Sequence, residues 1–144
     1  MTLKEAILLA TEKHGECRDR CGVLYILHPI AVMMDLQKRG CDEVVLKVAV
    51  LHDVIEDTDV ELVDICDQLT QREYDALKAI TKLDEEDYWT YIKRVKENEI
   101  ATIVKKADLK HNNNIERLVK TGKDFMSITK RYVKAYAILD GREV

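Results

Sequence analysis

The sequence predicts an all-α protein, because its composition, its apolar periodicity and its helix-start signals all favour helices. Only 5 of the 144 residues are glycine and 1 is proline, whereas a β-sandwich or barrel needs many tight turns. Apolar residues recur at helical spacing, and no alternating run is long enough to build a sheet. The length is typical of one domain, so we expect a single domain over residues 1–144.

Threonine–glutamate pairs three residues apart mark three expected helix starts, because each side chain can cap the other's backbone. The pairs are Thr2 with Glu5, Thr58 with Glu61, and Thr70 with Glu73. Pro29 suits the first position of a helix, where its missing N–H costs nothing, and Gly40 suits the end of that helix. The expected helices span, in order, 3–14, 29–39, 43–55, 59–68, 71–81, 85–97, 98–111 and 124–140, and residues 15–27 form a loop.

The helix expected over 43–55 is apolar around nearly its whole circumference, which is typical of a buried central helix. His52 and Asp53 lie near its end, where a buried charge is costly unless it is paired or bound to a metal. A lone buried histidine is commonly a satisfied core residue, but the adjacent aspartate favours a metal. At about 1.5 Å per residue, the helix from Pro29 rises about 16 Å and the next returns about 15 Å, so antiparallel packing brings His52 level with His28.

A fourth polar group, Asp108, lies at the border of the apolar face of the helix expected over 98–111. A carboxylate in that position needs a partner, and a cation is a natural one. Two histidines with two carboxylates suit a divalent ion such as Mn²⁺, Fe²⁺ or Zn²⁺. Such a set would leave coordination positions open for water and substrate.

Two further acids, Glu56 and Asp57, follow His52 and Asp53 by four residues and therefore project to the same side of the helix. Acidic residues are disfavoured at the C-terminal end of a helix, so their presence suggests a chemical role such as activating a water molecule. The alternative is an ordinary acidic helix end. Asn112, one turn past Asp108, is either a helix C-cap or a group that faces the metal.

The net charge of −4 argues against non-specific binding to nucleic acid. Residues 105–134 nevertheless carry nine Lys/Arg against three Asp/Glu, a local net charge of +6. This basic segment suits a small phosphorylated ligand, and the alternative is a solvated helix face.

The expected location is the cytoplasm, with no membrane partner. No apolar run reaches the roughly 18–20 residues that span a bilayer, and the N-terminus lacks the features of a signal peptide. We therefore expect Cys17, Cys21, Cys41 and Cys66 to be reduced.

Four segments carry a more specific resemblance. They are Tyr25–Pro29 (YILHP), Leu51–Thr58 (LHDVIEDT), Thr81–Leu83 (TKL) and Lys106–Asn112 (KADLKHN). A histidine before proline, a His-Asp pair and a distant aspartate resemble the HD-domain metal-dependent phosphohydrolases. Taken together, the four segments and the sequence around them, over roughly residues 3–118, resemble the hydrolase domain of the RelA/SpoT family.

That resemblance implies an all-α HD domain that binds Mn²⁺ and removes the 3′-pyrophosphate from ppGpp and pppGpp, giving GDP or GTP. The chain has no room for a synthetase domain, so it resembles a small stand-alone alarmone hydrolase. Glu56 and Asp57 would serve the hydrolytic water, Asn112 matches a nucleotide-contacting asparagine, and Lys105 matches a lysine three residues before the metal aspartate. The implied metal ligands are His28, His52, Asp53 and Asp108.

The chain departs from the family where the base is recognised. Asp19 and Arg20 stand where an Arg-Lys pair usually packs around guanine, so Arg20 is the expected substrate contact, with Arg18 as an alternative through a shift of the loop. Leu109 replaces an arginine of the long enzymes. Two other functions therefore stay open: an HD phosphohydrolase acting on another nucleotide, and a non-catalytic nucleotide-binding regulator, which would have no need of the two acids Glu56 and Asp57.

Overall fold

The computed structural model describes residues 1–113 and 125–142, and this part of the chain is helical without a β-sheet. The all-α prediction is confirmed. One isolated antiparallel bridge, between Arg18 and Leu24, closes the loop after the first helix. The helices are α1 (Leu3–His14), α2 (Leu27–Lys38), α3 (Glu43–Asp57), α4 (Leu62–Ile65) with the 3₁₀ turn η1 (Cys66–Gln68), α5 (Gln71–Ile80), α6 (Tyr88–Lys96), α7 (Glu99–Asn112) and α9 (Phe125–Leu139).

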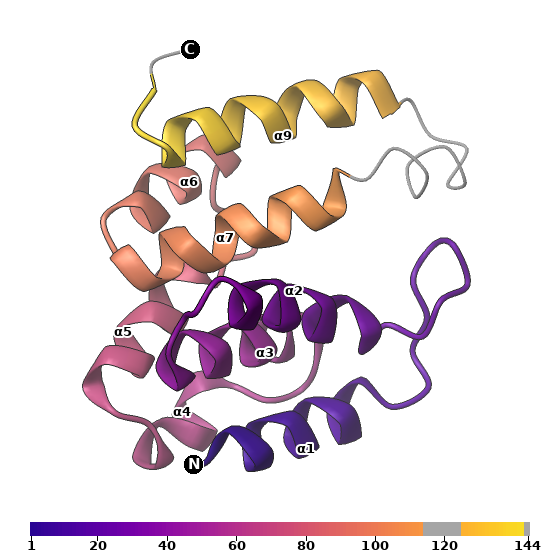
Figure 1. Ribbon diagram of the computed structural model, residues 1–144, viewed down its shortest axis with the longest axis vertical. Coiled ribbons are helices and arrows are strands. Elements are labelled where there is room, and N and C mark those ends of the chain that lie inside the picture. The colour runs from indigo at the N-terminus through magenta and orange to yellow at the C-terminus, as the bar shows by residue number, and fades with distance from the viewer. Residues whose placement is uncertain (114–124, 143–144) are drawn as a thin grey trace.

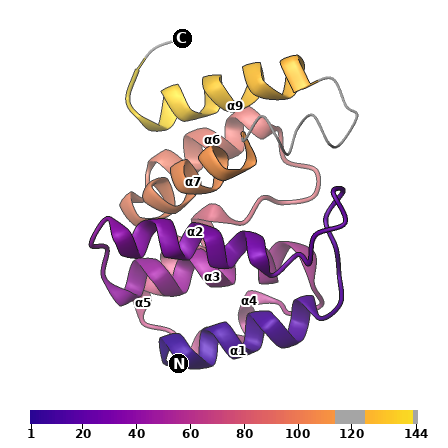
Figure 2. The same cartoon turned by 45° about the vertical axis from the view of Figure 1, so that its right-hand side comes forward.

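Helix α3 is the centre of the fold, because it packs against α1, α2, α5 and α7. Figures 1 and 2 show α1 at one end of the molecule, α2 and α3 next, then α6 and α7, and α9 at the other end. Helix α7 contacts both α2 and α3 on one side and α6 and α9 on the other. The polar residues of α2, α3 and α7 therefore meet where these three helices pack together.

The sequence of α3 explains its central position. Asp42 caps its first turn by accepting a hydrogen bond from the Val45 N–H at 3.2 Å. Nine of its fifteen residues are buried, including His52 and Asp53. The helix continues through Asp57, two residues beyond the expected end, so Glu56 and Asp57 lie on its last turn.

The capping boxes at Thr2 and Thr70 are present, but the one expected at Thr58 is wrong. Because α3 continues to Asp57, Thr58 ends that helix instead, and its Oγ1 donates to the Val54 carbonyl at 2.7 Å. Glu61 then caps α4 together with Asp64. The helix expected over 59–68 is consequently reduced to α4 and the turn η1.

Helix α2 begins at Leu27, two residues earlier than expected, so Pro29 is its third residue. The position still suits proline, because the first four N–H groups of a helix have no helical acceptor. Gly40 follows the end of α2 with a φ of 82°, a left-handed conformation that favours glycine.

No helix in the described ranges is long and apolar enough to cross a membrane. All four cysteines fall within those ranges, and none of them forms a disulfide.

A buried ion pair fastens α5 to α3. Lys47 Nζ lies 2.6 Å from Glu73 Oε2, and the side chains are 14% and 2% exposed. Glu73 Oε1 also accepts the Thr70 N–H at 2.9 Å. Burial opposes ionisation, but Lys47 and Thr70 outweigh it and hold the pKa of Glu73 below its usual value. The pair therefore stabilises the fold at neutral pH, and its contribution is lost as the pH falls through that lowered pKa.

We predict that Lys47→Met lowers the free energy of unfolding by about 3–5 kcal/mol at pH 7, because it leaves a buried carboxylate unpaired. Urea denaturation measures the change. The double variant Lys47→Met with Glu73→Gln, which keeps an acceptor for the Thr70 N–H, should regain much of the loss. A single variant within 1 kcal/mol of the wild type would contradict this account of the pair.

Candidate metal centre

Four buried side chains from three helices converge at the junction of α2, α3 and α7. His28 comes from α2, His52 and Asp53 from α3, and Asp108 from α7. One potential ligand atom of each lies within 4.8 Å of those of the others. The imidazole rings of His28 and His52 have their centroids 6.3 Å apart, so the α2–α3 hairpin brings them level as the helix lengths predict.

The hydrogen bond of His52 determines which of its nitrogens faces the cluster. Its Nδ1 lies 2.6 Å from the Ala49 carbonyl oxygen, which can only accept, so Nδ1 carries a proton. The opposite nitrogen, Nε2, lies 3.2 Å from Asp53 Oδ1 and 3.5 Å from Asp108 Oδ1. Both His52 Nε2 and Asp53 Oδ2 are buried without a hydrogen-bond partner. This arrangement fits a bound cation, because lone pairs of four ligands point into one small space.

The electrostatics of His52 show how strongly this space attracts positive charge. Burial alone would lower its pKa, but the Asp53 carboxylate and then Asp108 outweigh burial and raise the pKa of His52 to about 10. A divalent metal would satisfy the same acids and compete with that proton.

Asp108 is held by three neighbours. Its Oδ1 lies 2.7 Å from His28 Nε2 and accepts from Asn112 Nδ2 at 3.2 Å. Its Oδ2 accepts from Lys105 Nζ at 3.0 Å. Burial would raise the pKa of Asp108, but Lys105 and then His28 outweigh it and hold that pKa well below the usual range. Asp108 is therefore ionised and available as a ligand.

Lys105 is itself largely buried, with 13% of its side chain exposed. Its ammonium lies 5.4 Å from the centre of the Tyr91 ring, within cation–π range. Burial would lower the pKa of Lys105, but Asp108 outweighs burial and raises it well above its usual value. Lys105 thus supplies a fixed positive charge beside the cluster.

The two acids on the last turn of α3 are fixed by other elements. Glu56 Oε1 accepts the Lys82 N–H at 2.7 Å, and Asp57 Oδ2 accepts the Tyr25 hydroxyl at 3.0 Å. Both residues are exposed at the end of the helix, but neighbouring protein atoms partly desolvate their carboxyls. That desolvation raises the pKa of each, and Asp53 adds to the rise for Asp57.

The residues expected to recognise the base lie in the loop between α1 and α2. Arg20 is exposed there, and its role stays a prediction. The Asp19 carboxylate accepts the N–H groups of Cys21 and Val23 at 2.8 and 3.0 Å. Arg18 donates to the Gly22 carbonyl at 2.9 Å. Asp19 and Arg18 therefore both hold the turn of this loop.

The basic segment, residues 105–134, lies partly within the described residues. Arg117, Lys120 and Lys123 lie outside the described residues. Lys106 pairs with Asp140 at 2.6 Å, and the Lys134 ammonium lies 4.2 Å from the centre of the Trp89 ring. Asn112 is the last residue of α7, and the C-cap of that helix is Asn113, so Asn112 is not the cap. Its Nδ2 instead donates to Asp108 Oδ1 at 3.2 Å, at the edge of the cluster.

Sequence reasoning assigned no role to three residues that contact this centre. Tyr25 and Lys82 bind the two acids, and His111 lies against His28, with 2.6 Å between their Nδ1 atoms. All three lie within the sequence segments that resemble the RelA/SpoT family, and this position was the one signal in the sequence that could have identified them. His14, although buried, has no hydrogen-bond partner for its Nε2, and its ring lies 4.9 Å from that of Tyr25.

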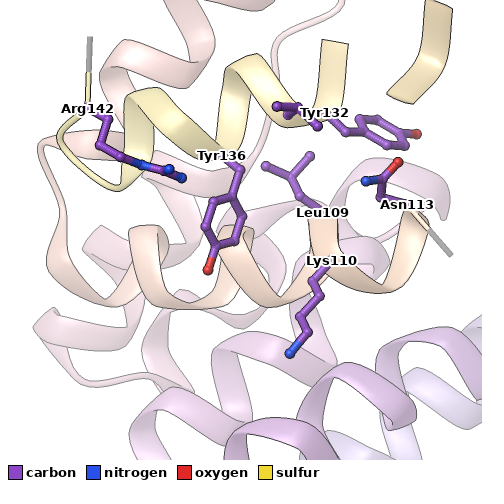
Figure 3. A pocket seen from close by; sticks show the side chains of 7 residues that line it. Leu109, Lys110, Asn113, Tyr132, Tyr136 and Arg142 are labelled. Atoms are coloured by element: carbon purple, nitrogen blue, oxygen red, sulfur yellow. The ribbon is translucent and has the colours of Figure 1, made fainter. Parts of the chain in front are cut away.

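A cavity of about 450 Å³ lies between α7 and α9, away from this cluster (Figure 3). At about 100° per residue, Leu109, Lys110 and Asn113 occupy a different side of α7 from Asp108 and Asn112. Figure 3 shows Leu109 and Tyr136 between the two helices, with the Lys110 side chain directed away from α9. This cavity is therefore separate from the site of the buried histidines and carboxylates.

Comparison with known proteins places this geometry in context. The chain is 34% identical over 86 residues to a guanosine-3′,5′-bis(diphosphate) 3′-pyrophosphohydrolase of Aquifex aeolicus, covering 60% of this chain and 12% of that protein. It is 30% identical over 152 residues to the GTP pyrophosphokinase rsh of Brucella ovis, covering 97% of this chain and 20% of that protein. No family model matches the chain.

A solved structure of a metazoan ortholog of SpoT that hydrolyses ppGpp has a TM-score of 0.78 and 23% identity, covering 95% of this chain and 84% of that one. The chain carries an HD domain that resembles the hydrolase domain of the RelA/SpoT family. It spans 12% to 20% of the length of the curated relatives named above.

We predict that the purified protein retains one divalent metal ion per chain and that His52→Ala and Asp53→Ala abolish its retention. Each change removes one of four converging ligands. Elemental analysis after gel filtration measures the content. Glu12→Ala, which alters an exposed residue of α1, is the control and should retain the ion. Equal metal content in the wild type and the ligand variants would contradict the assignment.

Proposed function

We propose that this chain is a Mn²⁺-dependent pyrophosphohydrolase that removes the 3′-pyrophosphate of ppGpp and pppGpp to give GDP and GTP. The observation that carries the proposal is the buried cluster of two histidines and two aspartates, with two more acids one turn beyond it on α3. The names of the similar hydrolases support the choice of substrate. We further propose that the whole chain acts as one HD domain in the cytoplasm.

In this proposal His28, His52, Asp53 and Asp108 hold the metal. When bound, the ion would supply positive charge for the substrate phosphates and lower the pKa of a nearby water molecule. Glu56 and Asp57 would accept the proton of the attacking water. Their raised pKa values suit that task, because a general base works best when its pKa approaches the operating pH.

Lys105 and Asn112 would contact the substrate phosphates beside Asp108. A lysine ammonium has three N–H donors, and the bond to Asp108 uses one of them. Tyr91 also lies beside the ammonium, so one donor of Lys105 would remain for a phosphate oxygen. Arg20, exposed in the α1–α2 loop, is the proposed contact for the base.

One observation favours a second candidate, an HD phosphohydrolase for a nucleotide with another base. Asp19, which stands in the position of an expected base-recognising cation, is used to close its own loop. A substrate panel with Mn²⁺ separates the two candidates. The panel compares ppGpp with NADPH, common nucleotides and 3′-phosphoadenosine compounds, and the highest kcat/KM on ppGpp is the expected result. A clear preference for another compound would favour the second candidate, and no turnover of any compound would favour a binding protein.

We predict that Glu56→Gln and Asp57→Asn keep the metal and the fold, and that at least one of them lowers kcat by about 10²–10⁴. The substitutions remove charge while preserving size. Steady-state kinetics on the best substrate of the panel, together with metal analysis, checks both points. Near wild-type rates in both variants would mean that these acids are ordinary residues of the helix end and take no part in the reaction.

The same two acids predict the pH dependence. A base is active only when deprotonated, so kcat should rise with pH along an acidic limb. Because burial raises the pKa of Glu56 and Asp57, the midpoint should lie above the ordinary values of 4.5 and 3.8. A rate profile between pH 4 and pH 9 tests this, and loss of the limb in one variant identifies the base. A limb at or below the ordinary values would contradict the assignment.

A further inference from the structure

His28 has polar partners on both sides of its ring. Its Nε2 faces the cluster, 2.7 Å from Asp108 Oδ1 and 3.5 Å from Asp53 Oδ2. Its Nδ1 lies 2.6 Å from the Nδ1 of His111. Two lone pairs at that separation would repel, so one of the two nitrogens must carry a proton.

The direction of this hydrogen bond depends on what Nε2 of His28 binds. Without a metal, Nε2 donates to the Asp108 carboxylate at 2.7 Å, and a bound metal would take the Nε2 lone pair in place of that proton. A neutral imidazole has one N–H, and a metal-binding nitrogen must present its lone pair. If Nε2 of His28 faces the metal, its proton is on Nδ1, and His28 donates to His111. His111 Nδ1 is then the acceptor, and the proton of His111 is on its own Nε2.

The hydrogen bond of His52 fixes its tautomer in the same way. There the Nδ1 proton goes to the Ala49 carbonyl at 2.6 Å, which leaves Nε2 for the cluster. Both histidines of the cluster thus have an acceptor behind them, a backbone carbonyl for one and a side chain for the other. Such acceptors fix the tautomer and ring orientation of a metal-binding histidine.

Helix α7 supplies both contacts of His28. Asp108 and His111 are three residues apart and therefore lie on one face of the helix. The rings of His28 and His111 have centroids 4.7 Å apart and are tilted by 36°. His111 is outside the group of converging ligand atoms, so its place is behind His28 and not in the cluster.

We propose that His111 is a positioning residue, which accepts the Nδ1–H of His28 and holds the Nε2 lone pair of that ring toward the metal. This inference rests on the proposed metal-binding role of the cluster. It assigns His111 a role in metal affinity that does not require contact with the metal or the substrate.

Two variants of the full-length protein separate the acceptor from the ring. In His111→Asn the Oδ1 atom takes the place of Nδ1 and can accept the same hydrogen bond, whereas His111→Phe keeps a ring but has no acceptor. The expected result is a dissociation constant for Mn²⁺ that rises about 10–100-fold in His111→Phe and stays close to wild type in His111→Asn. Isothermal titration calorimetry with MnCl₂ alone measures both, without a substrate.

Thermal melting of the metal-free proteins distinguishes positioning from general stability. The two variants should melt at similar temperatures and differ only in the stabilisation that Mn²⁺ adds. Wild-type affinity in His111→Phe, or equal weakening in both variants, would overturn the proposal. A wild-type protein that binds no metal would overturn the proposed function as well. Asp53→Ala, which removes a proposed ligand, is the control that shows the signal expected without metal binding.

A direct observation does not depend on the variants. Long-range ¹H–¹⁵N spectra of the zinc-loaded wild type report which nitrogen of each histidine carries the proton. The proposal requires the proton of His28 on Nδ1 and an unprotonated Nδ1 in His111. A proton on His111 Nδ1 would contradict it. His111 would then donate to the Nδ1 of His28, and the proton of His28 would be on Nε2, which could no longer bind a metal.

Discussion

The burial of two imidazoles and two carboxylates in one small space is the constraint on which the rest of the structure depends. The four residues are each at most 6% exposed, and their ligand atoms lie within 4.8 Å of one another. Buried charges are unfavourable unless they are paired or bind a metal. A proton on His52 meets part of this demand, and a divalent cation bonded to all four side chains would meet it more fully.

The scaffold around this cluster limits how far the four residues can move. The central helix α3 is buried on nearly every side, and the Lys47–Glu73 pair ties it to α5. Helix α7 brings Asp108 together with its own cation, Lys105, so the aspartate stays ionised despite its burial. The hydrogen bonds of the histidines to Ala49 and His111 restrict the two rings from behind. Rigid placement of this kind favours binding of one metal in one geometry.

Much of the fold could be predicted from the sequence, because helix periods and caps are local signals. The approach of His52 to His28 also followed from two helix lengths, since a short turn leaves antiparallel packing as the simple arrangement. The bonds from Tyr25 to Asp57 and from Lys82 to Glu56 were not predictable, because they join residues 32 and 26 apart whose orientation depends on tertiary packing. The capping error at Thr58 had a local cause: one threonine can start a helix or end the preceding one, and the length of α3 decided between them.

The site combines an anionic cluster that calls for a cation with two acids of raised pKa at its edge, an arrangement suited to directing water at a phosphorus atom. Hydrolysis of ppGpp in H₂¹⁸O with Mn²⁺, followed by mass spectrometry, tests this claim most directly. Attack of water on the phosphorus next to the ribose breaks the bond between that phosphorus and the 3′ oxygen. The account therefore predicts one ¹⁸O atom in pyrophosphate and unlabelled GDP. Label in the 3′ oxygen of GDP, or release of orthophosphate in place of pyrophosphate, would contradict it.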